Sequence, residues 1–378
     1  MLGGVGEPHA RDVKLRASVE KRIAGSPDAA LLLLGDVFQG AGLLGFCAGQ
    51  SQRRSTPDCV QRGSVDAQLD AILGPFARSF PGHPLVAVAG AADHAGDPAA
   101  TANACARIPR AAAGWRYVAR GCGLDGDRPI ARLDAGALAV VLLDSEAMLD
   151  DDAFRARALE ALHAELAAVR QARPQAWVVL ALYHPLESYG ARNGADWSAA
   201  LQKDLYPLYG TLLFPFTRPL EWALGHRAES PWEWPVRSLR RALYEALSAS
   251  PVDAVVSAQD ESLQLVELDH PGARWQVVAG AAARKTRVKR LGLDWLWTNR
   301  LARLIGLEDA GPSVRHTLVF GAGRDDDDTR SGYGYAVLAA TPSQLQVEFW
   351  DLARAEPLGV AQLPRAGDAA HRGEREDQ

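Results

Sequence analysis

Short apolar runs that end at turn residues constrain the fold of this 378-residue chain more than any other feature. They span residues 30–34, 85–89, 138–143, 177–182, 254–257, 263–268, 275–278 and 317–320. Their leucine and β-branched side chains predict sheet strands that are buried on both faces. Between them, residues 65–80, 150–173 and 236–247 have apolar side chains at helical spacing, although Pro75 would shorten the first. Strands that alternate with helices predict a layered α/β fold.

A hairpin predicted over residues 331–350 turns at Thr341-Pro342-Ser343 and adds antiparallel strands, so we expect mixed sheets. Hydrophobic residues make up 48% of the chain, which is enough to bury a large core. The formal net charge is −5, whereas a general nucleic-acid-binding protein is usually strongly basic. We therefore expect no nucleic-acid partner, and no apolar run is long enough to predict a membrane-spanning helix.

The compartment has two interpretations. The cysteines form two neighbouring pairs, Cys47/Cys59 and Cys105/Cys122, which fit either two disulfides in an oxidising compartment or free thiols in the cytosol. The composition, rich in Ala, Arg, Leu and Gly and poor in Lys and Met, indicates a GC-rich bacterial genome. A glycine-rich turn at residues 3–8 normally follows a buried strand, yet only two residues precede it, so we expect a longer natural N-terminus that could include a signal peptide. Cytoplasm and periplasm both fit.

Five short segments have the frames of metal-binding motifs but few side chains that bind metal. They read Gly3-Gly4-Val5-Gly6-Glu7-Pro8, Leu34-Gly35-Asp36, Ala89-Gly90-Ala91-Ala92-Asp93, Tyr183-His184-Pro185 and Ser257-Ala258-Gln259-Asp260-Glu261. Together they resemble the motifs of the calcineurin-like metallophosphoesterase family, in its bacterial, purple acid phosphatase-like branch. The resemblance implies a four-layer sandwich of two mixed sheets flanked by helices, in one domain of residues 1–363, followed by a disordered tail at 364–378.

The resemblance also implies where metal ligands would lie. Asp36 keeps the residue that the family uses to bridge two metal ions. The remaining positions, which include one for a histidine that stabilises the leaving group, hold Gly4, Ala91, Ala92, Tyr183, Gln259 and Glu261. Glycine and alanine have no donor atom, and a transition-metal pair needs several imidazole and carboxylate ligands. A two-metal centre is therefore not expected.

Polar side chains nonetheless remain at or beside these positions. Asp36, Asp93, His184, Asp260 and Glu261 are predicted to line a vestigial acidic pocket that is filled with water. The alternative is one divalent cation, Mg²⁺, Ca²⁺ or Mn²⁺, held by Asp36 and Glu261, since hard cations accept oxygen ligands and water.

Two histidines and one strand end near this pocket have structural and catalytic interpretations. His94 or His184 could act as a general acid, because imidazole titrates near neutral pH. A lone histidine in a loop more often has a structural role, which is the preferred interpretation. Asp144-Ser145 follows a predicted strand and resembles a family element that is interpreted as structural.

Two aromatic segments interrupt the alternation of strands and helices. Residues 190–235 form a predicted insertion rich in proline, and residues 284–306 form a basic segment. Tryptophans in them, with neighbouring Arg and Lys, could contact an anionic membrane surface; they are Trp222, Trp232, Trp234, Trp295 and Trp297. The preferred alternative is that the two segments pack on each other as a cover over the sandwich, because prolines prevent one long amphipathic helix in the first.

The function that fits this sequence best is that of a catalytically inactive metallophosphoesterase homologue that binds a protein or small-molecule partner or serves as a scaffold. One alternative is a phosphoester hydrolase with a remodelled single-metal or metal-free site. The other is a peripheral membrane or envelope protein.

Overall fold

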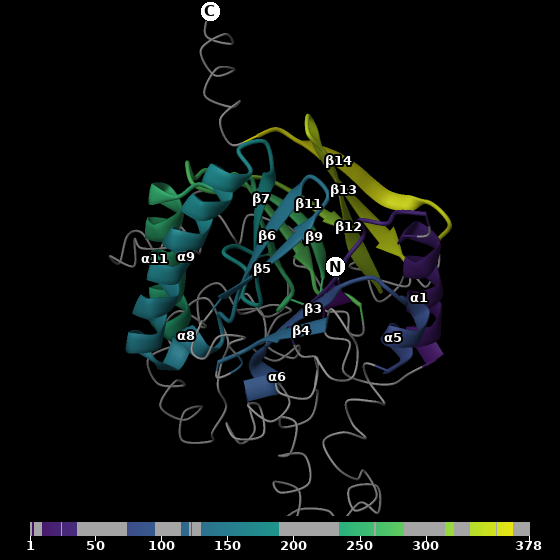
Figure 1. Ribbon diagram of the computed structural model, residues 1–378, viewed down its shortest axis with the longest axis horizontal. Helices are drawn as coiled ribbons and strands as arrows, with labels where there is room; N and C mark the ends of the chain where they lie inside the picture. The colour runs from purple at the N-terminus through teal and green to yellow at the C-terminus, as the bar shows by residue number, and fades with distance from the viewer. Residues whose placement is uncertain are drawn as a thin grey trace, which may run out of the picture.

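The computed structural model describes residues 2–3, 10–23, 25–35, 74–94, 115–120, 122, 130–188, 234–260, 262–282, 314–320, 333–352 and 354–365. These residues form a mixed α/β fold of three sheets with helices on their outer faces (Figure 1). The α/β class predicted from the alternation of strands and helices is confirmed.

The largest sheet has seven strands in the order β11-β9-β10-β8-β7-β6-β5. Its middle strands β6, β7, β8 and β10 are parallel, whereas β5, β9 and β11 run antiparallel to their neighbours. The bounds are β5 Ile130–Ala135, β6 Leu138–Leu143, β7 Trp177–Leu182, β8 Ala254–Ser257, β9 Leu263–Leu268, β10 Trp275–Ala279 and β11 Val314–Phe320.

Two smaller sheets lie against the seven-stranded sheet. One is parallel in the order β1-β2-β3-β4, with bounds Leu2–Gly3, Leu31–Leu34, Leu85–Val88 and Trp115–Val118. The other is antiparallel in the order β12-β13-β14, with bounds Gly334–Thr341, Gln344–Asp351 and Pro357–Leu363. One apolar cluster joins all three sheets; it includes Leu34, Val88, Leu142, Val179 and Phe349.

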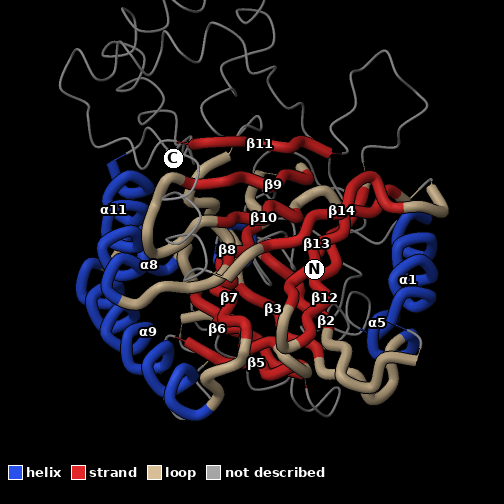
Figure 2. The backbone as a smooth tube through the Cα atoms, turned by 90° about the horizontal axis from the view of Figure 1, so that it is seen from above, coloured by secondary structure: helices blue, strands red, loops and turns tan. Residues whose placement is uncertain are grey.

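Helices cover the opposite faces of these sheets (Figure 2). Helices α8 (Ala147–Asp150), α9 (Asp152–Ala172) and α11 (Trp234–Ala249) pack on the seven-stranded sheet, and α1 (Ala10–Ile23) and α5 (Gly74–Ser79) pack on the four-stranded sheet. A short helix, α6 (Ala91–His94), follows β3. The buried residues of α9 recur every three or four positions and therefore form one apolar stripe; they are Phe154, Ala158, Leu162, Leu166 and Val169.

The strands predicted from apolar runs are all present, and strands such as β2, β3, β6, β7 and β8 are buried at every position. The helix predicted at 150–173 is confirmed as α9, which begins after Asp151 because Asp151 Oδ1 accepts a hydrogen bond from Phe154 N at 2.8 Å and caps it; the short helix α8 precedes this cap. Of the helix predicted at 65–80, the described part is α5, with Pro75 in its first turn. Strands β4 and β5 and helix α1 were not predicted, since their charged residues hide the apolar pattern, and β14 was not predicted, since proline and glycine interrupt its apolar run.

Several predicted features lie wholly or mostly outside the described residues. They include Trp222, Trp232, Trp295, Trp297 and the basic segment at 284–306; of the 190–235 insertion, Trp234 and Pro235 are described and begin α11. Cys122 is disulfide-bonded, but its partner lies outside the described residues, so the predicted pairing is untested. No helix in the described ranges is long and apolar enough to cross a bilayer.

The predicted tail begins with residues that the structure does describe. Arg365 donates hydrogen bonds to the carbonyl oxygens of Gln175 and Pro342, both at 2.7 Å. Its guanidinium carbon lies 4.2 Å from the centre of the Trp177 ring. The chain is therefore held as far as Arg365, and residues 366–378 lie outside the described part.

Candidate functional site

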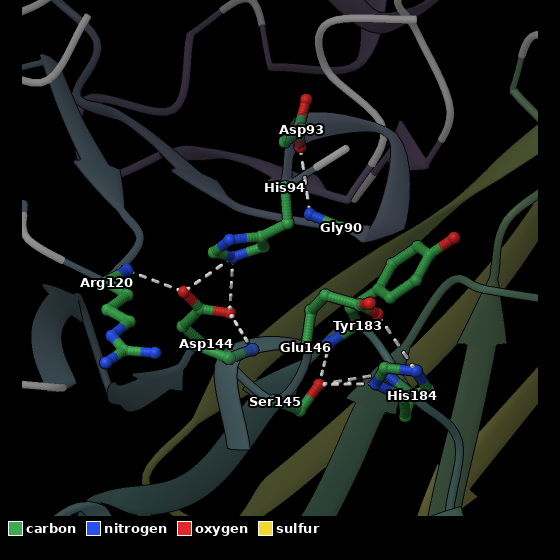
Figure 3. A network of polar contacts seen from close by, with 10 residues as sticks. Gly90, Asp93, His94, Arg120, Asp144, Ser145, Glu146, Tyr183 and His184 are labelled. Atoms are coloured by element: carbon green, nitrogen blue, oxygen red, sulfur yellow. Dashed lines mark hydrogen bonds and ion pairs between the residues drawn. The ribbon is translucent and has the colours of Figure 1, made fainter. Parts of the chain in front are cut away.

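The candidate site lies where β3, β6, β7 and β8 end (Figure 3). Parallel strands present their carboxyl ends at one edge of a sheet, so the turns after β6, β7 and β8 lie side by side. The turn after β3 reaches them from the four-stranded sheet, because His94 in α6 contacts Asp144 after β6. The site therefore joins two sheets.

The structure brings five of the predicted site residues into this region in buried positions. They are Asp93, Tyr183, His184, Gln259 and Asp260. Ala91 and Ala92 lie in the first turn of α6. Gly4, Asp36 and Glu261 lie outside the described residues, so the pocket predicted to include Asp36 and Glu261 can be described only in part.

Asp144 is the residue that ties the turns together. His94 Nε2 donates to both of its carboxylate oxygens, at 3.1 and 2.9 Å. The same carboxylate accepts from Arg120 N after β4, at 2.6 Å, and from Ala147 N at the start of α8, at 3.1 Å. Asp144 is fully buried and follows β6 of the seven-stranded sheet, whereas His94 and Arg120 follow strands of the four-stranded sheet. It thus cross-links the two sheets at their carboxyl edge.

His94 carries a proton at neutral pH. Burial by itself would lower its pKa, but the negative charge of Asp144, its hydrogen bond to His94, and the charges of Glu146 and Asp93 together raise the pKa from 6.5 to about 9. The side chain is 18% exposed, so water screens these charges only in part. Its proton is therefore committed to the cross-link with Asp144 rather than available at neutral pH for transfer.

Ser145, His184 and Glu146 lie in a row that resembles a nucleophile with its base. The Ser145 hydroxyl, however, already uses all of its hydrogen-bonding capacity. Ser145 Oγ accepts from the backbone amides of Tyr183 and His184, at 3.2 and 3.1 Å. Both of its lone pairs are then occupied, so its own hydrogen points to His184 Nδ1 at 3.0 Å. His184 consequently carries its ring hydrogen on Nε2, which lies 3.3 Å from Glu146 Oε2. All three residues are buried, so Ser145 is a structural bridge and not a nucleophile.

Tyr183 fills the space beside the strand end that leads to Asp36. Gly35 has a positive φ of 66°, and a Cβ atom added there would lie 1.9 Å from Cδ2 of the Tyr183 ring. The ring is 1% exposed and meets the His184 ring edge-on, with 5.0 Å between centroids. An aromatic ring therefore packs directly on the glycine that precedes Asp36.

A second cluster of buried polar side chains lies between the end of β8 and the start of β9, around Gln264. Gln264 Nε2 is within hydrogen-bond distance of Ser188 Oγ (3.1 Å), Asp260 Oδ2 (3.2 Å) and Ser262 Oγ (2.6 Å). Asp260 is 1% exposed, so its carboxylate is engaged inside the protein. Asp93 is held similarly, because its Oδ2 accepts from Gly90 N at 2.8 Å. These predicted pocket carboxylates are bonded to neighbouring groups, as Figure 3 shows for Asp93.

The segment after His184 is anchored to the helical layer. Gln276 Oε1 accepts from Leu186 N at 2.6 Å and from Glu187 N at 3.1 Å. The Glu187 carboxylate forms an ion pair with Arg240 of α11, and Tyr244 donates to it at 3.3 Å. Burial raises the pKa of Glu187, while Arg240 opposes the shift. This clamp holds the turn that carries Tyr183 and His184.

The described residues do not supply the ligands of a dinuclear metal centre. Within the described ranges no group of three His, Cys, Asp or Glu side chains could hold a metal ion. Tyr183 lies where the metallophosphoesterase resemblance would place a ligand histidine, and its ring is buried, while Ala91 and Ala92 have no donor atom. The chemistry left in the described site is that of a hydrogen-bonded network of carboxylates and imidazoles.

Glu146 and Gln264 were not recognised from the sequence, and Asp144 was interpreted only as a structural element. Asp144, Ser145 and Glu146 directly follow a strongly apolar strand, which is the one signal that could have indicated them. Nothing local distinguishes Gln264, since it lies within β9 and becomes important only through its neighbours.

Comparisons with known proteins bear on the fold alone. No model of a known family matches this chain, and no curated protein matches its sequence. Among solved structures, the fold is similar to that of GAP50, described as the anchor in the inner membrane complex of Plasmodium, with a TM-score of 0.50 and 12% identity. The similarity covers 96% of this chain and 87% of that chain.

Proposed function

We propose that this chain is a degenerate metallophosphoesterase-type protein that acts as a binding or scaffold protein and does not hydrolyse phosphoesters. The helix and sheet arrangement supports the fold part of the proposal. Helices α9 and α11 pack on the seven-stranded sheet, helices α1 and α5 pack on the four-stranded sheet, and one apolar cluster joins the three sheets, an arrangement that supports a layered sandwich. The structural similarity to GAP50 over 96% of the chain agrees with one fold that spans nearly all of it.

The single observation that carries the proposal is the position of the Tyr183 ring. In the family pattern a histidine at this position would bind metal next to the carboxylate that Asp36 retains. Here the ring packs on Gly35 so closely that a Cβ atom there would lie 1.9 Å from it. The ring is buried, and a tyrosine at this position supplies no imidazole nitrogen to a ligand set.

The charge of the described site also opposes phosphoester binding. Four buried carboxyl groups lie in or beside the network, on Asp93, Asp144, Glu146 and Asp260. The one imidazolium, on His94, is already bonded to Asp144. A phosphoester would enter a region rich in carboxyl groups, in which the described residues offer no metal ligand set to neutralise them.

Metal analysis combined with phosphatase assays tests the proposal. The purified protein is incubated in turn with Mn²⁺, Zn²⁺, Fe²⁺ and Mg²⁺ and dialysed, and its metal content is measured. Turnover of p-nitrophenyl phosphate and bis(p-nitrophenyl) phosphate is then compared with that of Asp36→Asn. We expect substoichiometric metal and the same background rate in both proteins. Stoichiometric metal with turnover that Asp36→Asn abolishes would refute the proposal and favour a remodelled hydrolase.

A further inference from the structure

Strand β14 forms a free edge of the three-stranded sheet. It pairs with β13 on one side and with no other described strand (Figures 1 and 2). Val360, at its centre, is 52% exposed, and only Val13 is another large exposed hydrophobic residue in the described ranges. An edge strand presents unpaired backbone N–H and C=O groups, which another strand can bind.

The edge of β14 lacks the charges that usually keep edge strands apart. Its sequence, PLGVAQL, has no charged residue. Two edge strands of the other sheets do carry charged side chains: β4 has Arg116, and β5 has Arg132 and Asp134, whereas the two-residue edge strand β1 has none. Pro357 and the shift in strand register between Phe349 and Trp350 hinder the pairing of another strand only at the first residues of β14.

Two copies of β14 match each other when they pair antiparallel about Val360. In that register Val360 lies opposite Val360 of the second copy, Gly359 opposite Ala361, and Leu358 opposite Gln362. No like charges face each other, and two β-branched side chains meet at the centre, a favourable cross-strand pair. The contact is isologous, so it closes as a dimer and does not continue into a fibre.

We propose that β14 is a self-association surface, through which two chains join their three-stranded sheets across a two-fold axis at Val360. The absence of charge favours a second copy over a charged peptide partner. The chain's own last residues do not fit the edge, since residues 371–377 carry several charges. Moreover, Arg365 is bound to the carbonyl oxygens of Gln175 and Pro342, so the chain leaves β14 toward the start of β7. This proposal does not depend on the proposed function.

Light scattering over about a hundredfold range of protein concentration tests the association, because a reversible dimer must respond to concentration. We expect the apparent mass of the full chain to rise from one chain to two. Val360→Lys places two ammonium groups opposite each other and should keep the chain monomeric, while its circular dichroism spectrum stays unchanged because Val360 is exposed. The matched control is Val13→Lys, at the other exposed valine, which should still dimerise. A wild-type monomer throughout, or a dimer that persists in Val360→Lys, would overturn the proposal.

Disulfide trapping tests the register. Under mild oxidation Val360→Cys should form a covalent dimer, because the two-fold axis brings each residue 360 next to its copy. Gln362→Cys is the matched control: it faces Leu358 in the proposed register and should remain uncross-linked. The wild-type chain, oxidised in parallel, accounts for the native cysteines. Cross-linking of Gln362→Cys in place of Val360→Cys would contradict the pairing about Val360.

Discussion

The ion pair between His94 and Asp144 makes stability depend on pH in a defined direction. The His94 pKa is about 9 in the folded protein against an ordinary value of 6.5. A histidine with a raised pKa contributes stability that is fully present below pH 6.5 and is lost as the pH rises through about 9. We therefore expect the protein to lose stability on the alkaline side because of this residue.

The size of the loss follows from the two pKa values. A difference from 6.5 to about 9 is equivalent to about 3 kcal/mol in the free energy of unfolding. Roughly 2 kcal/mol of it falls between about pH 7 and about pH 9.5, since the unfolded-state histidine is already mostly neutral at pH 7. The His94 side chain is 18% exposed, so little of this is removed by solvent screening.

Urea unfolding of the wild type and of His94→Gln at about pH 7 and at about pH 9.5 measures how much His94 contributes to the free energy of unfolding. Glutamine keeps a hydrogen-bond donor near Asp144 but cannot titrate, so the variant should lose about 2 kcal/mol less than the wild type over this range. Other groups titrate in both proteins, and their contributions cancel in the difference. His270→Gln is a control, because burial lowers the pKa of His270 and its effect falls on the acid side. Equal losses in the wild type and His94→Gln would refute the reasoning.

Two further predictions concern packing around the site. Gly35→Ala should cost about 3 kcal/mol, because it combines a positive φ with a collision against the Tyr183 ring, whereas Gly82→Ala has a similar φ but open space and should cost about 1 kcal/mol. Equal costs in thermal unfolding would show that the ring does not pack as described. Glu187→Gln leaves its mostly buried guanidinium partner uncompensated and should cost about 3 kcal/mol. Arg241→Ala breaks an exposed pair and should cost less than about 0.5 kcal/mol; a similar loss for both would contradict the buried clamp.

Sequence reasoning was most successful where a strand is buried on both faces. Such a strand is apolar at every position, so a strand such as β7 can be predicted from its continuous apolar run. Strand β5 was not predicted because Arg132 and Asp134 interrupt its apolar pattern. Arg132 forms ion pairs with Asp134 and Glu165 at the surface of the sheet. The candidate site was only partly predictable for a related reason: motif positions indicate which residues follow a strand, but not what each side chain contacts.

The sequence by itself determined the strands that are apolar along their length, the α/β class and the absence of donor atoms at positions such as Ala91, because these depend on residue identity and local pattern. Only the tertiary structure decided that Asp144 cross-links two sheets, that Ser145 is saturated, and that the Tyr183 ring packs on Gly35. These contacts join residues that are between 24 and about 150 positions apart in the chain. Their geometry depends on how the carboxyl ends of strands from different sheets meet, which no local pattern encodes.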